Sequence, residues 1–304
     1  MRAGVKQKAA QNCGLLIVLL FLSLCLSQAN AREAYRPYKD RLFAYPGILE
    51  VGYNGDYILV DYQIERDIYQ RDYVAEQEVH SEYISLKPKW ATRQVSMQLA
   101  GVHLDHRRVG QVTKKTRQIV FFLHGKGGDS RLGMSDYRFG GNFNRLKNLS
   151  YRNDGVYITA DFTDFGNNGA AQVLELMQYY ARKAPQANIS LACASMGSLI
   201  CYQMANNSQA LQYLDAMIIL GGANHRALYQ SKLFEKRIPV VIAHGTNDRA
   251  YDWKQQFNHY AAFKKNNPAY PVRLTLFKNG SHGTPIRMID WRLTLNWLSN
   301  AAPK

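Results

Sequence analysis

The 304-residue sequence predicts an α/β fold in which a mainly parallel central sheet is flanked by helices. Two observations carry this prediction: the short segments are apolar on both faces, and the longer segments between them have helical periodicity. From Gln118 onward, short stretches that are apolar throughout alternate with longer segments of helical periodicity. Strands with this continuous apolar character are typical of parallel sheets, because helices cover both of their faces. The expected strands cover residues 119–123, 156–160, 189–194, 216–220, 239–243 and 272–277.

Helices are expected between these strands and after the last one. Residues 170–181 carry apolar side chains at helical spacing. Asp252 can cap a helix that covers residues 253–265. Thr284 and Pro285 can open a final helix that extends through residue 298, because proline suits the first helical turn.

The N-terminal third predicts a β-rich extension of the same domain. Residues 48–51 and 57–60 flank Asn54-Gly55-Asp56, a hairpin signal because Asn and Gly tolerate the positive φ of tight turns. Residues 83–86 and 95–99 are further expected strands. Neither an internal repeat nor a low-complexity linker interrupts residues 32–304, which predicts one domain with a β-rich part (32–117) and a catalytic α/β part (118–304).

The N-terminus predicts a secretory signal peptide over residues 1–31. Arg2, Lys6 and Lys8 precede an apolar run at 15–26, and Ala29-Asn30-Ala31 has the small-x-small form of a cleavage site. A twelve-residue helix is about 18 Å long, short of the ~30 Å hydrocarbon core. A secreted or periplasmic protein is therefore expected, with no integral membrane span after cleavage.

The net charge limits the kinds of partner that the sequence predicts, and the cysteine positions bear on whether a disulfide is expected. The net charge of +15 falls to +12 when the signal peptide is removed, which suits a solvated basic surface or contact with an anionic envelope component. Zinc-ligand spacing, basic-helix arrays and RNA-binding aromatic signatures are absent from the sequence, so no nucleic-acid partner, metal or other cofactor is expected. Cys193 and Cys201, which remain after cleavage, lie in apolar stretches and are expected to be buried free thiols.

Ser195 is the candidate nucleophile. It follows the expected strand 189–194 in the sequence Cys-Ala-Ser-Met-Gly and precedes an apolar helix. A serine on a sharp strand-to-helix turn presents a free Oγ, and the close packing behind it favours small residues two positions away on either side. Cys193 and Gly197 occupy those positions.

Asp248 and His282 are the candidate acid and base. Asp248 follows the strand 239–243, and His282 lies on a Gly-flanked loop after the strand 272–277. A carboxylate there can orient an imidazole, which in turn can accept and return a proton near neutrality. The competing candidates are Asp252 for the acid, and His225 and His124 for the base.

The Gly-rich segment His124-Gly125-Lys126-Gly127-Gly128-Asp129 follows the first α/β strand. Its backbone can direct an N–H group at the oxyanion of a tetrahedral intermediate, together with the N–H of Met196. Lys126 is the first choice for the donor from this segment and Gly127 the second. A phosphate loop is disfavoured, because Lys126 precedes Gly127 and Gly128 instead of following them.

The segments HGKGGD, CASMG, HGTND and GSHG, in this order over Gln118 to Ser299, resemble the α/β-hydrolase superfamily of serine esterases and lipases. The resemblance implies a Ser195–His282–Asp248 triad and an oxyanion hole near Lys126 and Met196. The departure from the family pattern is Cys193, which stands in the place of the usual glycine.

The resulting expectation is an exported serine hydrolase that cleaves carboxylic esters through an acyl-enzyme intermediate. Only some 18 residues separate Leu220 from Pro239, so no large cap domain is expected there, and residues 130–154 are the other candidate cover. An open site suits a bulky ester such as decorated polysaccharide. An acyltransferase, thioesterase or peptidase with the same triad, or a non-catalytic binding protein on this scaffold, are the alternatives.

Overall fold

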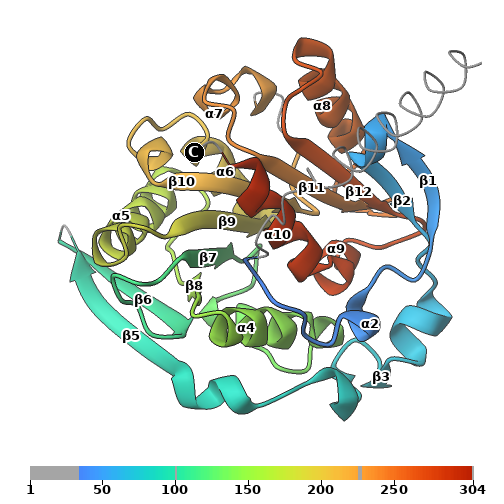
Figure 1. The fold of residues 1–304 in the computed structure, drawn as a ribbon, viewed down its shortest axis with the longest axis horizontal. Helices are drawn as coiled ribbons and strands as arrows, with labels where there is room; N and C mark the ends of the chain where they lie inside the picture. The colour runs from blue at the N-terminus through green and yellow to red at the C-terminus, as the bar shows by residue number, and fades with distance from the viewer. Residues whose placement is uncertain (1–33, 100, 225–227, 303–304) are drawn as a thin grey trace, which may run out of the picture. The chain divides into compact units, whose positions relative to one another are not determined.

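The computed structural model describes residues 34–99, 101–224 and 228–302, and the expected signal peptide lies outside them. The described residues form one compact unit built on a ten-stranded sheet with the strand order β1-β2-β12-β11-β10-β9-β7-β8-β6-β5 (Figure 1). The seven strands from β2 to β8 in this order are parallel, and β1, β6 and β5 pair antiparallel at the two edges. The strands of this sheet are β1 Ile48–Gly52, β2 Tyr57–Val60, β5 Thr92–Leu99, β6 Val102–Val109, β7 Gln118–Leu123, β8 Val156–Ala160, β9 Asn188–Ala194, β10 Leu214–Leu220, β11 Val240–Gly245 and β12 Val272–Phe277.

Helices cover both faces of the sheet, as the continuous apolar character of its strands requires. One face packs on α5 (Asn167–Lys183), α6 (Ser198–Met204), α7 (Lys232–Glu235) and α8 (Trp253–Asn266). The other face packs on α4 (Asn142–Arg152), α9 (Thr284–Met288) and α10 (Trp291–Ala301) (Figure 1). A small second sheet of β3 (Asp72–Val74) and β4 (Glu78–Val79) and the short helix α2 (Asp40–Phe43) belong to the N-terminal part.

Most of the expected elements are confirmed. All six α/β strands form within one or two residues of the expected bounds, and residues 48–51 and 57–60 pair as an antiparallel hairpin. The helices at 170–181 and 253–265 correspond to α5 and α8, and the side chain of Asp252 caps α8 by accepting the N–H of Lys254.

Three features differ from the expectation. The strand expected at residues 83–86 is wrong: the backbone N–H and C=O of Ser85 bond instead to the side-chain amide of Asn144 on α4. The long final helix is interrupted, because Asp290 accepts the N–H of Leu293 and so caps a new helix, α10. Strand β6 was not expected at all, since its sequence VHLDHRRV mixes apolar and charged residues.

The segment 130–154 is not a detached cover. It forms α3 (Ser130–Gly133), a 3-10 turn at Phe139–Gly141 and helix α4, of which residues 142–150 are all buried. Between β10 and β11 the described residues form only a short 3-10 turn and α7, so no large cap stands over this end of the sheet. The segment instead builds one wall of the candidate site.

Two buried arginines tie the N-terminal part to the last helices. Arg145 on α4 is fully buried, and its guanidinium lies 3.0 Å from carboxylate oxygens of both Asp40 and Asp290. Arg287 on α9 lies 2.6 Å from Asp72. Removing one partner of such a buried pair leaves an uncompensated charge, so these contacts hold the N-terminal part in register with α9 and α10.

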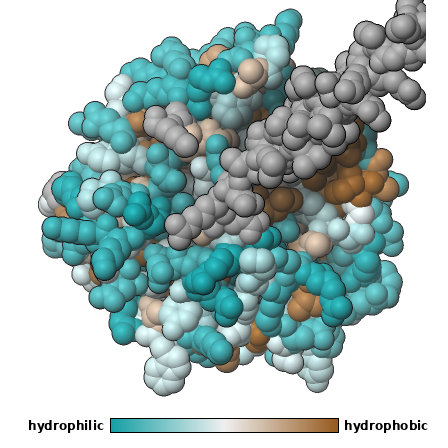
Figure 2. Space-filling model, in the orientation of Figure 1, coloured by the Kyte–Doolittle hydropathy of each residue, from teal (hydrophilic) through white to brown (hydrophobic). Residues whose placement is uncertain are grey.

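The surface in view is mostly hydrophilic, with apolar side chains gathered near the edge of the sheet where β1 lies (Figure 2). Ile48, Leu49 and Val51 of this edge strand are exposed. No helix within the described residues is both long and apolar enough to cross a bilayer.

The expectation of free thiols is wrong: Cys193 and Cys201 form a disulfide. Cys193 lies near the end of β9, and Cys201 lies one turn into α6, which folds back over the same strand. Their Cα atoms are 6.3 Å apart, within the usual range for a disulfide. Both side chains are fully buried, so their apolar flanks indicated burial correctly but not oxidation state.

We expect the Cys193→Ala/Cys201→Ala variant to unfold more easily than the parent protein. The bond closes a loop with a sequence separation of 8, for which the chain-entropy relation gives a loss of about 2.5 kcal/mol in the free energy of unfolding. Urea unfolding followed by circular dichroism measures this difference. Reductant should lower the midpoint of the parent and leave that of the variant unchanged, and a parent midpoint insensitive to reductant would contradict the disulfide.

Candidate active site

Ser195 sits on a sharp turn between β9 and α6. Its φ is 52°, in the left-handed region that a non-glycine residue enters only when its surroundings impose it. Two glycines make the turn possible: a Cβ on Gly197 would lie 2.6 Å from the carbonyl oxygen of His124, and one on Gly125 would lie 2.7 Å from the Cβ of Ser195. The expected strand–turn–helix context of the nucleophile is therefore present.

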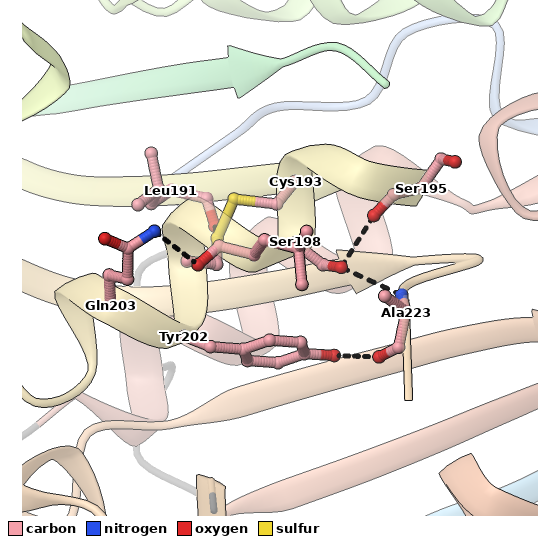
Figure 3. Close-up of a disulfide and its surroundings, with 9 residues drawn as sticks. Leu191, Cys193, Ser195, Ser198, Tyr202, Gln203 and Ala223 are labelled. Carbon is pink, nitrogen blue, oxygen red and sulfur yellow. Dashed lines mark hydrogen bonds between the residues drawn. A yellow bond between two sulfur atoms is a disulfide. The ribbon is translucent and has the colours of Figure 1, made fainter. Parts of the chain in front are cut away.

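Side-chain hydrogen bonds hold the turn from behind (Figure 3). The hydroxyl of Ser198 donates to the carbonyl of Ser195 at 2.6 Å and accepts the N–H of Ala223 at 2.9 Å. The hydroxyl of Tyr202 donates to the carbonyl of Ala223 at 2.8 Å. The disulfide of Cys193 lies beside this network, at the base of α6 (Figure 3). The backbone of the turn is thus fixed to both α6 and the segment that follows β10.

The structure brings Ser195, His282 and Asp248 together in one hydrogen-bonded row. Nε2 of His282 lies 2.8 Å from Oγ of Ser195, and Nδ1 lies 2.7 Å from Oδ2 of Asp248. The three residues follow the carboxyl ends of β9, β12 and β11, which are neighbours or near neighbours in the parallel sheet. The imidazole is about one-third exposed, whereas the carboxylate is fully enclosed.

Asp248 is held as a carboxylate by its hydrogen bonds. Burial favours its protonated form, but hydrogen bonds from His244, His282 and the backbone N–H groups of Ala250 and Tyr251 outweigh burial and lower its pKa below the usual carboxyl range. Bonds to the backbone take up Oδ1, which leaves Oδ2 facing His282. The row therefore has a charged acceptor at its inner end.

His244 is a member of the site that the sequence analysis missed. It is the penultimate residue of β11, is fully buried, and places Nε2 at 3.0 Å from both Oδ2 of Asp248 and the carbonyl oxygen of Tyr251. Both neighbours are acceptors, so the proton of this imidazole is assigned to Nε2. The available signal was its position, at a strand end four residues before Asp248.

The competing candidates take other places. Asp252 caps α8 and does not contact His282. The ring of His124 stacks on Phe162, with centroids 4.3 Å apart, and its Nδ1 lies against the carbonyl of Gly125. His225 lies outside the described residues.

A hollow of about 180 Å³ opens beside Ser195 and His282. Apolar side chains from four different elements form its walls: Leu132, Phe139, Leu220 and Ile286. Gly125 and Lys126 complete the rim, whereas Gly127 is one residue beyond it. The backbone of Gly125 and Lys126 therefore runs directly past the nucleophile, where an oxyanion donor is needed, and the four apolar walls are residues that the sequence analysis did not single out.

Within the described residues, no group of three or more His, Cys, Asp or Glu side chains is arranged to hold a metal ion.

No family model matches the sequence, and no curated protein is significantly similar to it. Solved structures are similar to it in fold. An esterase from Pyrococcus furiosus aligns at 14% identity with a TM-score of 0.53, over 72% of this chain and 96% of its own. A lidless α/β serine hydrolase from Xanthomonas campestris aligns at 13% identity with a TM-score of 0.50, over 70% and 96%.

The acylaminoacyl peptidase of Pyrococcus horikoshii aligns at 15% identity with a TM-score of 0.51, over 70% of this chain. This chain spans 42% of the length of that peptidase. At these identities the likeness establishes the fold, which is that of the α/β hydrolases and is shared here with esterases and a peptidase.

We expect His244→Leu to slow the reaction of Ser195 with a fluorophosphonate about tenfold or more, since a lost hydrogen bond to a charged group costs about 1.5–3 kcal/mol. The lowered pKa of Asp248 contributes stability that is present above the ordinary carboxyl value of about 3.9 and is lost as the pH falls through the lower folded value. Without the donor this pKa rises, so the variant should lose activity and stability at a higher pH than the parent does.

His244→Gln keeps an N–H near Asp248 and should restore much of the activity and the acid limb of the pH–rate profile. His103→Leu, at the exposed β5–β6 hairpin, is the matched control. An unchanged pH–rate profile for His244→Leu would show that this histidine does not act on Asp248.

Proposed function

We propose that the protein is an exported serine hydrolase that cleaves carboxylic esters through an acyl-enzyme intermediate. The observation that supports this most directly is the continuous row from Oγ of Ser195 through His282 to Asp248, with contacts of 2.8 and 2.7 Å. A nucleophile, a base within hydrogen-bond reach of it and a group that orients the base are the parts that acyl transfer requires.

In the first half-reaction Oγ of Ser195 attacks the ester carbonyl carbon while its proton passes to Nε2 of His282. The negative charge of Asp248 stabilises the imidazolium that forms. The tetrahedral intermediate collapses when Nε2 gives its proton to the leaving alcohol oxygen, and the acyl group remains on Oγ. In the second half-reaction, water attacks the acyl carbon, its proton passes through Nε2 to Oγ, and the carboxylic acid leaves.

The N–H of Met196 and that of Lys126 are the proposed donors to the oxyanion. Met196 directly follows the nucleophile on its tight turn, and Lys126 lies on the rim of the hollow beside Ser195. Each such donor typically contributes on the order of 3 kcal/mol to lowering the barrier. Gly127, which lies beyond the rim, is the weaker candidate.

The apolar hollow is proposed to receive the acyl part of the ester. Its volume of about 180 Å³ is small, which suits a short acyl chain. The alcohol part then faces solvent on the side where His282 is exposed, and no large cap limits its size. The proposed substrate is therefore a short-chain acyl ester of a bulky alcohol, such as a decorated polysaccharide.

Export rests on the signal-peptide pattern of residues 1–31 and is supported by the disulfide of Cys193 and Cys201. Disulfides persist in oxidising compartments and are rare where thiols are kept reduced. A secreted or periplasmic location accommodates both features.

Ser195→Ala should abolish ester turnover without unfolding the protein. Loss of the serine of a triad costs on the order of 10⁶ in kcat, because the triad acts as a unit. Hydrolysis of p-nitrophenyl acetate, with circular dichroism as the fold control, measures the effect. Retained hydrolysis in this variant would exclude Ser195 as the nucleophile. Faster turnover of a matched thioester would identify a thioesterase instead of an ester hydrolase, and faster turnover of an acylated peptide would identify a peptidase. Faster acyl transfer to an added alcohol than to water would identify an acyltransferase.

The acyl-length preference should follow the size of the hollow. Acetyl and butyryl p-nitrophenyl esters should be turned over at least tenfold faster than the dodecanoyl ester. Phe139→Ala removes one wall and should shift the preference toward longer chains, because the freed volume admits more methylenes at ~0.8 kcal/mol each. Leu293→Ala, an exposed position on α10, is the control. A parent enzyme that prefers the dodecanoyl ester would exclude the hollow as the acyl site.

A further inference from the structure

A second and larger hollow lies at the opposite end of the sheet. Its volume is about 820 Å³, and it is formed by the turn before β5, the loop from β6 to β7 and the loop from α4 to β8. These segments flank the amino-terminal ends of β7 and β8, whereas Ser195 follows the carboxyl end of the parallel strand β9. This hollow, called the basic hollow below, is therefore separate from the candidate active site.

The basic hollow contains two arginines in an unfavourable arrangement. Arg93 of β5 and Arg108 of β6 are directly opposite each other in the antiparallel register, so both point to the same face of the sheet. Like charges that face each other across two strands destabilise a sheet. No carboxylate lies within 4.0 Å of either guanidinium in the described part of the chain.

Backbone contacts keep the two arginines in place. Arg93 donates to the carbonyls of Trp90 and Thr92, and Arg108 donates to the carbonyl of Gly110. Burial lowers the pKa of the nearby His106 to about 4, and the charge of Arg108 contributes to that lowering. Lys115 adds a third cation and Asp154 one carboxylate, so the lining carries an excess of positive charge.

An exposed aromatic side chain stands beside these charges. Trp90 is 86% exposed, the highest value among the large apolar side chains of the described residues. Tyr151 lines the same hollow and is 42% exposed. An indole that gains nothing from burial in the fold is free to stack on the flat face of a ligand.

We propose that the basic hollow binds an acidic polysaccharide. Sugar carboxylates fit the paired guanidinium groups, which offer bidentate donors and whose mutual repulsion a bound anion would relieve. The apolar face of a sugar ring fits Trp90, and the side chains of Gln111 and Thr113 can bond its hydroxyl groups. A concave site of this volume accepts a chain of several rings. A bilayer would instead contact a protruding surface. A nucleic-acid strand needs a longer row of cations and aromatic rings than this hollow contains.

The proposal does not depend on the proposed esterase activity, because the two sites lie at opposite ends of the sheet. Isothermal titration of the whole protein with polygalacturonate, which carries a carboxylate on each ring, tests it. Neutral dextran, vesicles of phosphatidylglycerol in phosphatidylcholine, and an oligo(dT) strand are the comparison ligands. Polygalacturonate should bind, more weakly at higher salt, and dextran should not.

Arg93→Gln/Arg108→Gln and Trp90→Ala should each weaken polygalacturonate binding about tenfold or more. The control Lys232→Gln/Lys236→Gln removes two exposed cations beside α7, far along the sheet, and should bind like the parent. Ester turnover of all these variants should equal that of the parent. If the double arginine variant does not fold, Trp90→Ala alone tests the proposal, because the exposed side chain of Trp90 contributes little to stability.

Three results would overturn the proposal. The first is a control pair that weakens binding as much as the arginine pair does, because the effect would then be one of net charge. Trp90→Ala and the arginine pair could both bind like the parent. Vesicles or oligo(dT) could bind through these residues while polygalacturonate does not, which would assign the hollow to a membrane or to nucleic acid.

Discussion

The left-handed turn at Ser195 is the constraint on which the site depends. A parallel strand that runs directly into a helix must reverse its backbone within one or two residues, and here the whole change of direction falls on the serine, with φ at 52°. This conformation is unfavourable for a side chain with a Cβ, so the surroundings must impose it. Gly125 and Gly197 give the space, Ser198 bonds the carbonyl of the turn, and the disulfide joins the strand to the helix on either side.

The disulfide explains the departure from the usual nucleophile motif. The position two residues before the serine points into the core beneath α6, where glycine is usual because the helix packs closely. Cys193 fits there because its sulfur is bonded to Cys201 on the packing helix itself, so the close approach becomes a covalent link. The same substitution thus keeps the turn compact and ties it to the layer of helices behind it.

The other half of the row is held by the N-terminal part of the chain. The loop that carries His282 leads directly into α9, where the buried Arg287 lies 2.6 Å from Asp72 and also donates to the carbonyl of Asp67. Arg71 donates to the carbonyl of Gly140, next to Phe139, which forms a wall of the apolar hollow beside Ser195. The β-rich N-terminal part therefore braces the base and the wall of the hollow, although it supplies none of the three residues of the row.

Much of this could be predicted from the sequence. The α/β strands were visible because continuous apolar runs reflect burial on both faces, and the row was visible because Ser195, Asp248 and His282 each follow such a strand. What escaped prediction depends on contacts in space. The disulfide partner of Cys193 and the walls contributed by Phe139 and Ile286 join residues whose local sequence carries no signal. The contact of His244 with Asp248 also escaped, and its signal was only a position at a strand end four residues before the acid. Strand β6 escaped for a different reason. It lies near the edge of the sheet, and its charged residues, Arg108 of the basic hollow among them, hide the apolar pattern of a strand.

The central claim is that the row of Ser195, His282 and Asp248 makes this serine hydroxyl a nucleophile. Labelling of the purified protein with a fluorophosphonate, followed by mass spectrometry of its peptides, tests that claim directly. The account predicts one covalent adduct, on Ser195, which His282→Ala prevents and His103→Ala does not. A folded protein that gains no adduct, or that is labelled equally well without His282, would contradict it.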